Sequence, residues 1–351
     1  MTDAKPPAFA DGFGVASKRH GGGGRLNVTD AKPPAFADGF GVASKRHGGA
    51  AAGGHSVAGL YTYRSMAAPQ DNSPQAWITD LEFERADPVR RLLRACIGNP
   101  IANYFPHFVQ RLVLGLMGSE LAAANWTDPG GWESMVISYA DRHRRLVDRL
   151  LCTFGTMPTA LRNRRRLAAR VIARLIDEAP CEPVEILCLG AGPGHIVNDA
   201  MRESRRRAHA TLVDLSSGAF DYGRRLAEES GQRECVRFIQ GDVRDVAGML
   251  DRPPHIVKMV GICEYLGDAC VAEIARTVAG VMPEGSWIVL NSLSKAHGTN
   301  RFFRRVLGLR MIHRSPDRLE ALLRPAGFTD FTALPEPMGV YHVIIGRKTS
   351  D

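Results

Sequence analysis

The chain contains 351 residues, of which 44% are hydrophobic and 23% are charged, and its formal net charge is +8 at pH 7. This composition is ordinary for a globular protein, and the length is enough for one large or two small domains. The positive charge permits nucleic acid, anionic lipid or an acidic substrate as a partner and does not select among them.

The seven cysteines form no C-x-x-C pair, which argues against a disulfide framework and against a zinc site. We therefore predict no metal and a reducing, cytoplasmic location. The most apolar stretch, residues 112–124, is shorter than the roughly 20 residues of a membrane span and contains Glu120. A transmembrane segment is not predicted, although contact with a membrane surface stays compatible with the sequence.

Residues 2–22 occur a second time, letter for letter, at residues 29–49. The units of a diverged repeat protein share a pattern and not every residue, so this identity indicates a recent duplication. The segment is rich in Gly, Ala and Pro and has few large apolar residues, which predicts a disordered tail over residues 1–55. Val28 takes the place of Met1 in the second copy, so position 28 is a second candidate start of translation.

Residues 56–160 are expected to form a helical region. Apolar residues recur there with a helical period that is interrupted by prolines. The next helix, predicted over residues 161–176, has an apolar stripe through Leu167 and Val171. The arginine run at residues 162–166 is expected on its solvated face. A cap that roofs an active site is one interpretation of these helices, and plain packing in the core is the other.

From Val184 onward, short apolar runs alternate with helical segments, which is typical of βα units on a parallel sheet. We expect strands at residues 184–189, 210–213, 236–239, 255–260, 287–290, 331–334 and 340–345. Helices are expected at residues 195–206, 220–230, 269–281 and 316–324.

A glycine loop, Gly190-Ala191-Gly192-Pro193-Gly194, lies between the first predicted strand and its helix. No lysine follows it, which excludes a P-loop, and His195 stands where a dinucleotide fingerprint needs its third glycine. The remaining G-x-G-x-G spacing still gives a tight turn above a helix N-terminus. Backbone amides there can bind a carboxylate or the edge of a sugar.

Two acids follow the next two strands. Asp214, 20 residues after Gly194, is placed to accept hydrogen bonds from both ribose hydroxyls of an adenosine. Asp242 ends the third strand and could accept from an adenine amino group. An acid after a strand is commonly a helix cap, so each signal alone is weak. Together with the glycine loop, they predict an adenosine-type ligand.

These motifs resemble the class I S-adenosylmethionine-dependent methyltransferases over residues 161–347, in the segments LCLGAGPG, LVD, FIQGD, IVKMVGICEYL and MPEGSWIVLNS. The resemblance implies a Rossmann-like α/β domain over residues 161–351, whose seven-stranded sheet has its last strand antiparallel. It implies S-adenosyl-L-methionine as cofactor, bound by Gly190, Ala191, Gly192, Gly194, Asp214, Leu215, Asp242, Val243 and Gly261. VGICEYL and MGVYHVIIGRK are also similar to a bacterial methyltransferase group that sometimes occurs joined to an α/β-hydrolase, although no G-x-S-x-G elbow is present.

The resemblance also bears on the acceptor side. The Asn/Asp-Pro-Pro-aromatic motif of base-amino methyltransferases is replaced here by a segment with Glu264 and Tyr265, which become the catalytic candidates. Glu264 would act as a base or an orienting group, or it would bind the loop or the cofactor's ammonium group. His195 and His313 are further candidates, and Cys263 is a weaker one because it has no partner cysteine.

We therefore expect methyl transfer to a small-molecule acceptor, lipid-like or a secondary metabolite. The alternative is an RNA-directed methyltransferase, or a cofactor-dependent RNA-binding protein, in which the arginine-rich helices contact phosphates. Transfer of the cofactor's aminocarboxypropyl arm is a third option within the same fold. The sequence does not indicate which oligomeric state the protein adopts.

Overall fold

The structure, a computed structural model, describes residues 73–349. The tail predicted over residues 1–55 lies outside the described residues, together with its duplicated segment and the second candidate start at position 28. The first part of the predicted helical region, up to residue 72, also lies outside them.

A single seven-stranded sheet has the order β3-β2-β1-β4-β5-β7-β6. Strands β1 to β5 are parallel, and β7 is antiparallel to both of its neighbours, β5 and β6. The predicted Rossmann-like α/β sheet with its last strand reversed is confirmed. The strands are β1 (Val184–Leu189), β2 (Ala208–Asp214), β3 (Val236–Gln240), β4 (Ile256–Met259), β5 (Trp287–Leu293), β6 (Phe328–Pro335) and β7 (Tyr341–Lys348).

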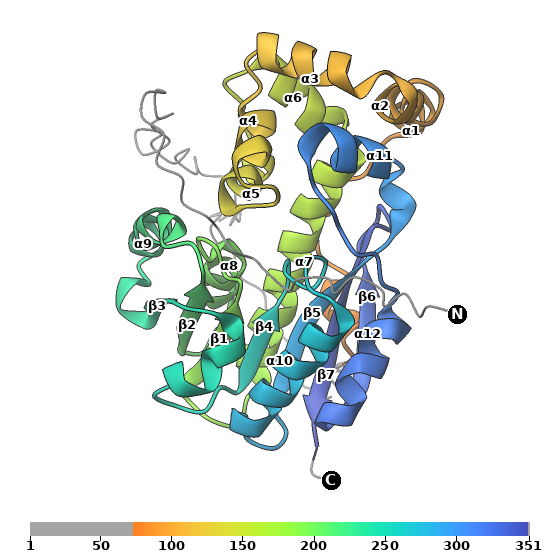
Figure 1. Cartoon of the computed structure of the whole chain (residues 1–351). Helices are drawn as coiled ribbons and strands as arrows, with labels where there is room; N and C mark the ends of the chain where they lie inside the picture. The colour runs from red at the N-terminus through yellow and green to blue at the C-terminus, as the bar shows by residue number, and fades with distance from the viewer. Residues whose placement is uncertain (1–72, 350–351) are drawn as a thin grey trace, which may run out of the picture. The chain divides into compact units, whose positions relative to one another are not determined.

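Helices cover both faces of this sheet (Figure 1). One face packs against α7 and α8, with α9 beside α8, and the other packs against α10 and α12. The strands between them are short apolar runs; β1 at the centre is buried at all but one of its positions, as expected for a parallel strand covered on both faces. The helices are α7 (Thr156–Glu178), α8 (His195–Glu203), α9 (Gly218–Glu229), α10 (Asp268–Val281) and α12 (Pro316–Leu323).

The helices from α1 to α6 form a cap together with α11 and the short helix η7 that follow β5. Figure 1 shows the cap beyond the end of the sheet at which β1 leads into α8. Its inner side is a small apolar core that includes Leu114, Val147 and Val306. The cap helices are α1 (Pro88–Leu93), η3 (Arg94–Gly98), α2 (Asn99–Tyr104), α3 (His107–Leu116), α4 (Glu120–Thr127), α5 (Trp132–Tyr139), α6 (Leu146–Phe154), α11 (Asn300–Phe302) and η7 (Phe303–Leu307).

The arginines of α7 are only partly on its solvated face. Arg165 donates to Asp199 at 2.7 Å, and Arg164 is 3% exposed and lies inside the protein. The expectation of a solvated arginine run is therefore wrong for Arg164. Position 164 comes three residues before the buried Leu167, so the helical period places both on the inner stripe.

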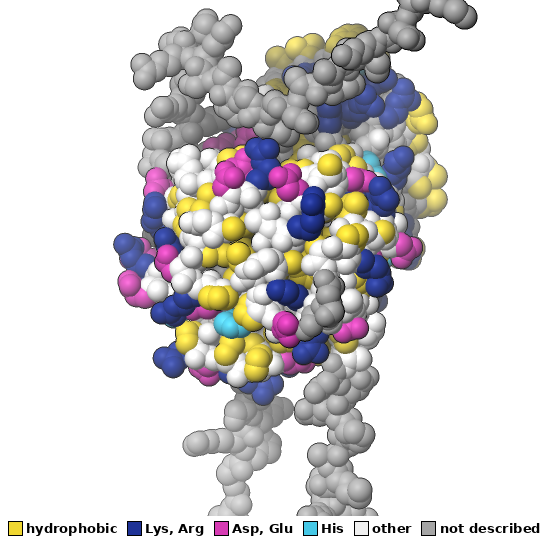
Figure 2. All heavy atoms as spheres, turned by 60° about the horizontal axis from the view of Figure 1, so that its bottom comes forward, with side chains coloured by type: hydrophobic (Ala, Val, Ile, Leu, Met, Phe, Trp, Pro, Cys, Tyr) yellow, Lys and Arg dark blue, Asp and Glu magenta, His cyan; other side chains and the backbone are white. Residues whose placement is uncertain are grey.

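The end of the molecule away from the cap has a mixed surface. Figure 2 brings the bottom of Figure 1 forward and shows basic and acidic side chains interspersed there, with scattered apolar groups between them. Such a surface is ordinary for the solvent-facing side of a globular protein.

Candidate cofactor and acceptor site

The glycine loop makes a turn that side chains would obstruct. Gly190, Gly192 and Gly194 all have positive φ, at 56°, 53° and 85°. A Cβ at Gly190 would lie 1.9 Å from Ile262 Cγ2, and one at Gly194 would lie 2.4 Å from Leu212 Cδ2. The loop therefore packs directly on β2 and on the turn that follows β4, without room for side chains at Gly190 and Gly194.

Asp214 is joined to this loop by hydrogen bonds. Its Oδ2 accepts from the Gly192 N–H at 2.8 Å, and its Oδ1 accepts from the Ser216 N–H at 2.9 Å. An ionised carboxylate has about four acceptor positions, so room for ribose hydroxyls remains. Leu215, the next residue, is 62% exposed and offers an apolar surface at the same place. The structure thus brings these predicted cofactor residues together.

Asp242 has local partners. It is the N-cap of the short helix η5 (Val243–Met249), accepts from the Arg244 N–H at 2.9 Å and pairs with the Arg244 side chain at 2.6 Å. Hydrogen bonding from Arg244 holds the pKa of Asp242 below its usual value. Val243 packs against the apolar core under the sheet. A cap is therefore a sufficient structural reason for Asp242, and its contact with adenine stays a prediction.

Glu264 forms a buried ion pair with Arg164. The two side chains are 4% and 3% exposed, and Arg164 Nη1 donates to Glu264 Oε1 at 2.9 Å. The guanidinium also lies over the ring of Tyr341, 4.6 Å from its centroid. Gly261, with φ of 95°, lies beside this pair, and a Cβ there would be in van der Waals contact with Arg164 Nη2 at 3.4 Å.

One atom on each partner of this pair is unsatisfied. Among the described residues, no group hydrogen-bonds Glu264 Oε2 or Arg164 Nε, although both atoms are buried. Buried polar atoms without partners are uncommon and costly, and a ligand bound at this point would satisfy both. The role of Glu264 stays a prediction.

Tyr265 touches the cap. A Cβ at Gly130, in the loop between α4 and α5, would lie 2.6 Å from the Tyr265 hydroxyl oxygen. Burial, and then the charge of Glu264, raises the pKa of Tyr265, so this hydroxyl is a neutral hydrogen-bonding group and not a base at neutral pH. Burial, and then the charge of Asp214, likewise raises the pKa of Asp128 in the same loop.

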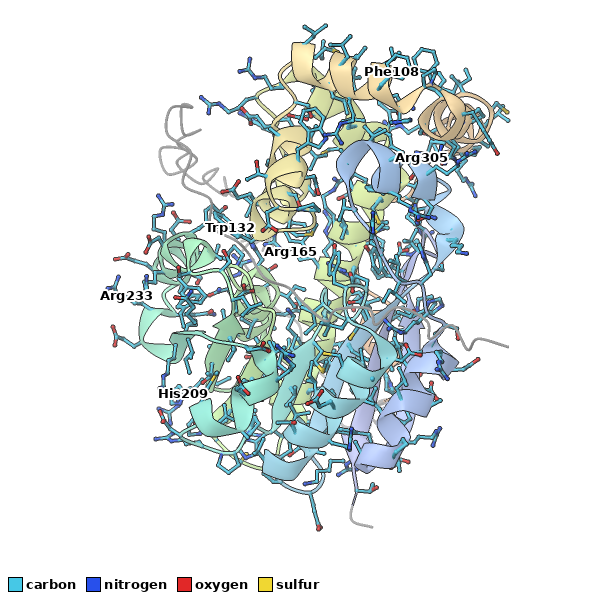
Figure 3. The ribbon with its side chains drawn as sticks, viewed as in Figure 1. Phe108, Trp132, Arg165, His209, Arg233 and Arg305 are labelled. Carbon is cyan, nitrogen blue, oxygen red and sulfur yellow. The ribbon has the colours of Figure 1, made fainter. Side chains whose placement is uncertain are left out.

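Trp132 extends this roof over the cofactor loop. A Cβ built on Gly192 would lie 3.5 Å from the Trp132 Cβ. A Cβ built on Gly218 would lie 3.7 Å from the indole nitrogen of Trp132. Its ring is 6.0 Å from that of Tyr222 on α9. In Figure 3, Trp132 and Arg165 are labelled close together where the cap meets the sheet domain. The cap thus closes the site from above.

Two histidines form a pair beside the Glu264 segment. The ring nitrogens Nε2 of His297 and His313 lie 3.3 Å apart, and the rings are stacked at 5.6 Å and 14°. Burial, and then the charge of the partner histidine, lowers the pKa of His297 to about 4. Burial, and then the charge of Lys295, lowers the pKa of His313. The N–H of Ile312 donates to the Glu264 carbonyl at 2.8 Å, which brings His313 next to that segment.

His195 and Cys263 fit structural roles. His195 opens α8 in a buried position, with its ring 5.5 Å from that of Tyr139. Burial, and then the charge of Arg165, lowers the pKa of His195 well below its usual value. Burial raises the pKa of the Cys263 thiol to about 12, so little nucleophilic thiolate forms at neutral pH.

Sequence analysis missed four residues of this site: Asp128, Trp132, Arg164 and His297. For Arg164 a signal was present, since the position follows the period of the buried stripe of α7. Asp128 and Trp132 flank the Pro129-Gly-Gly131 turn, which marks a loop but no ligand. Nothing in the sequence pairs His297 with His313, because only the tertiary fold does so.

No group of three metal-ligating side chains occurs among residues 73–349, and none of the helices described there has the length and hydropathy of a membrane span.

Comparisons with known proteins agree with this geometry. The family model described as "Putative methyltransferase" matches residues 143–348. The tRNA 5-carboxymethoxyuridine methyltransferase of Escherichia coli strain K12 is 26% identical over 125 residues, which are 36% of this chain and 46% of the relative. The chain therefore spans about half the length of the curated relatives it matches.

The chain is also similar to solved structures. A structure described as a possible exported protein from Bordetella parapertussis has a TM-score of 0.59 and 18% identity, over 68% of this chain and 86% of that chain. Magnesium protoporphyrin IX methyltransferase from Synechocystis PCC 6803 with bound SAH has a TM-score of 0.47 and 11% identity, over 68% of this chain and 99% of that chain.

Proposed function

Because the chain belongs to the methyltransferase family whose model spans residues 143–348, with S-adenosyl-L-methionine as its cofactor, we propose that it methylates a hydroxyl group of a small apolar molecule. When bound, the cofactor supplies an electrophilic methyl group on a sulfonium. The protein must then align the acceptor and hold its proton, and alignment alone can contribute roughly 7 to 11 kcal/mol.

The residues present fit the cofactor. The orphan Glu264 Oε2 suits an ammonium group, and the orphan Arg164 Nε suits a carboxylate, the two charged groups of the cofactor's amino-acid end. Asp214 suits the ribose hydroxyls, and its hydrogen bond with the Gly192 N–H holds it against the glycine loop. In this proposal Glu264 is a binding group and not the catalytic base.

The contacts of the cap with the rest of the site support a small acceptor. The loop with Gly130 meets Tyr265, and Trp132 meets Gly192, so the cap touches the acceptor segment and the cofactor loop at once. A site closed by helices at both points suits a compact molecule better than a polynucleotide. Met135 and Tyr139 of α5, which are only partly buried, favour an aromatic or lipid-like acceptor.

In this proposal the histidine pair accepts the proton that the acceptor hydroxyl loses. A hydroxyl acceptor must lose a proton during transfer, and a neutral imidazole is a suitable base. The lowered pKa values of His313 and His297 keep both rings neutral at pH 7. His313 is partly exposed and would take the proton, while the buried His297 would hold its ring in place through the 3.3 Å contact.

Two measurements test the proposal. Cofactor labelled on its methyl group is incubated with the protein and a cell extract, which is then separated into lipid, small-molecule, RNA and protein pools. We expect label in the lipid or small-molecule pool, whereas label confined to the RNA pool would contradict the proposal. Once an acceptor is found, His313→Ala should lower kcat by about 100-fold or more. His209→Ala is the control, because Figure 3 places His209 on the sheet, far from Trp132.

RNA remains the second candidate, since the curated relative is a tRNA methyltransferase. Two arginine runs, at residues 162–166 and 205–207, are already paired with acids. Arg162 and Arg165 contact Glu84 and Asp199, and the second run contacts Asp177 of α7 and Glu182. Fewer guanidinium groups are thus left for phosphates. Binding to RNA that weakens steeply between low and moderate salt would favour this candidate. The mass of the product separates methyl transfer from aminocarboxypropyl transfer.

The division into a helical region at residues 56–160 and a catalytic domain at residues 161–351 is part of the proposal, as is a cytoplasmic location. The boundary between them falls inside α7, so the two parts share a helix.

A further inference from the structure

The outer face of the cap is unusually apolar. A row of large hydrophobic side chains with a helical period runs along α1, η3, α2 and α3, and a second row runs along α6. We call these two rows the cap face. Its members, each at least 43% exposed, are Val89, Leu92, Leu93, Ile97, Ile101, Tyr104, Phe105, Phe108, Leu112, Val113, Leu116, Leu146, Leu150 and Phe154.

The inner sides of the same helices already have their partners. Leu114 of α3 and Val147 of α6 are buried together with Val306 of η7. Arg94 donates to the carbonyl of Phe154, which fixes the end of α6 beside η3. The cap face is therefore apolar surface in excess of what the cap needs to fold. Exposed patches of this kind mark interaction sites.

Basic side chains dominate on and around the cap face, where the acids at its edges, Asp87 and Glu120, face Arg90 and Arg145. Residues 88–117 and 300–311 contain arginines and no acid, and the only acid of residues 142–154 is the buried Asp148. The exposed arginines at its edges include Arg91, Arg149, Arg304 and Arg305. No carboxylate among the described residues pairs with these four. The opposite end, in Figure 2, mixes both signs.

A hollow of about 180 Å³ lies at the edge of this face, between α2, α3 and η7. Arg301 and Arg305 line it together with Asn103, Tyr104 and Gln110. Figure 3 shows Phe108 on α3 and Arg305 labelled on the same part of the cap. Apolar side chains next to a hollow with two guanidinium groups match the two parts of an anionic phospholipid, its chains and its head group.

We propose that the cap face docks on a membrane surface that contains anionic phospholipid. Helices with leucine and phenylalanine on one side and arginine beside them bind in the interface between head groups and acyl chains. A second copy of the chain fits less well. A twofold contact would bring the same arginine-bearing surface of each copy together without acids to oppose it.

The test measures binding of the full chain to vesicles, without cofactor or acceptor, so that its outcome is independent of the proposed reaction. Vesicles are made of phosphatidylcholine alone or with one-third phosphatidylglycerol. The first variant is Phe108→Ser with Leu112→Ser, and the second is Arg304→Glu with Arg305→Glu. Arg233→Glu is the control for charge, because Figure 3 shows Arg233 far from the cap. Circular dichroism checks that each variant is folded.

We expect the wild-type protein to sediment with the anionic vesicles and to stay in solution with the neutral ones. The serine variant should bind them at least tenfold more weakly, and the glutamate variant about tenfold more weakly. The control should bind as the wild type does. Failure of the wild type to bind overturns the proposal, as does binding that neither cap variant weakens. A stable dimer that the serine variant dissociates, without vesicle binding, would assign the cap face to a second copy.

Discussion

The two halves of the site are built in different ways. On the cofactor side, the glycine loop and Asp214 are neighbours through short hydrogen bonds between consecutive βα units. On the acceptor side, Glu264 meets Arg164 from a helix 100 residues earlier, and Tyr265 meets a loop of the cap. One half follows from local chain geometry, and the other depends on contacts that only the whole fold creates.

The largest effect should come from breaking the long-range half. Arg164→Met leaves Glu264 buried without its partner, which should lower the free energy of unfolding by about 3 to 5 kcal/mol in urea denaturation. Arg166→Met is the matched control: Arg166 is 42% exposed, contacts Glu84 at 3.0 Å and should cost less than about 1 kcal/mol. Replacing both Arg164 and Glu264 by apolar residues should recover much of the loss. Equal losses of unfolding free energy for Arg164→Met and Arg166→Met would contradict the prediction that the buried pair contributes more than an exposed one.

The histidine pair makes the acceptor half sensitive to acid. The unfolded chain protonates His297 near its ordinary value of 6.5, whereas the folded protein does so only near 4. Above pH 6.5 the histidine is neutral in both states, and the folded protein has its full stability. As the pH falls from 6.5 toward 4, only the unfolded chain takes up the proton, so the free energy of unfolding decreases by an amount on the order of 3 kcal/mol. His297→Gln should reduce the loss of stability between these two pH values, measured by thermal unfolding. His209→Gln should leave that loss as it is, and the same loss in both variants would contradict the prediction.

Asp214 tests the local half. Asp214→Ala should weaken binding of S-adenosyl-L-methionine by about 2 kcal/mol, roughly 30-fold in calorimetry, through loss of the ribose contact. Asp214→Asn keeps a side-chain oxygen that can accept from the N–H of Gly192 or Ser216. Because asparagine has nearly the same shape but no charge, this variant measures how much of the affinity depends on the charge. Unchanged affinity in the alanine variant would remove Asp214 from the cofactor site.

Substitution of Asp242 should have the smallest effect on the protein. It tests whether this carboxylate only caps a helix or also contacts the cofactor. Asp242→Ala removes the N-cap of η5 and the pair with Arg244, which should cost about 1 kcal/mol of stability. If the carboxylate also holds adenine, cofactor affinity falls as well. A loss of stability with full cofactor affinity would limit Asp242 to capping.

The fold was predictable because each element has its own local signal. The apolar runs of β1 to β7 and the glycine loop lie in short stretches of sequence, and the predicted strands match the observed ones. Glu264 was found by its place after the fourth strand, but its partner was not. Arg164 is the one fully buried member of its arginine run; the side chains of Arg162, Arg165 and Arg166 are 14%, 15% and 42% exposed, and the composition of the run does not tell these environments apart. The pairing of His297 with His313, and the contact of Gly130 with Tyr265, join segments that no local pattern relates.

α7 has a consequence for how this chain can be divided. Its 23 residues begin among the cap helices, carry Arg164 to the site and end beside the sheet. Met157 and Ala160, ahead of residue 161, are buried in the same cluster as Tyr341 of β7. A truncated chain beginning at residue 161 would thus open a hole in its own interior, whereas one beginning near residue 143, where the family match starts, keeps this helix whole. The sheet therefore needs the whole of α7 to fill its own interior.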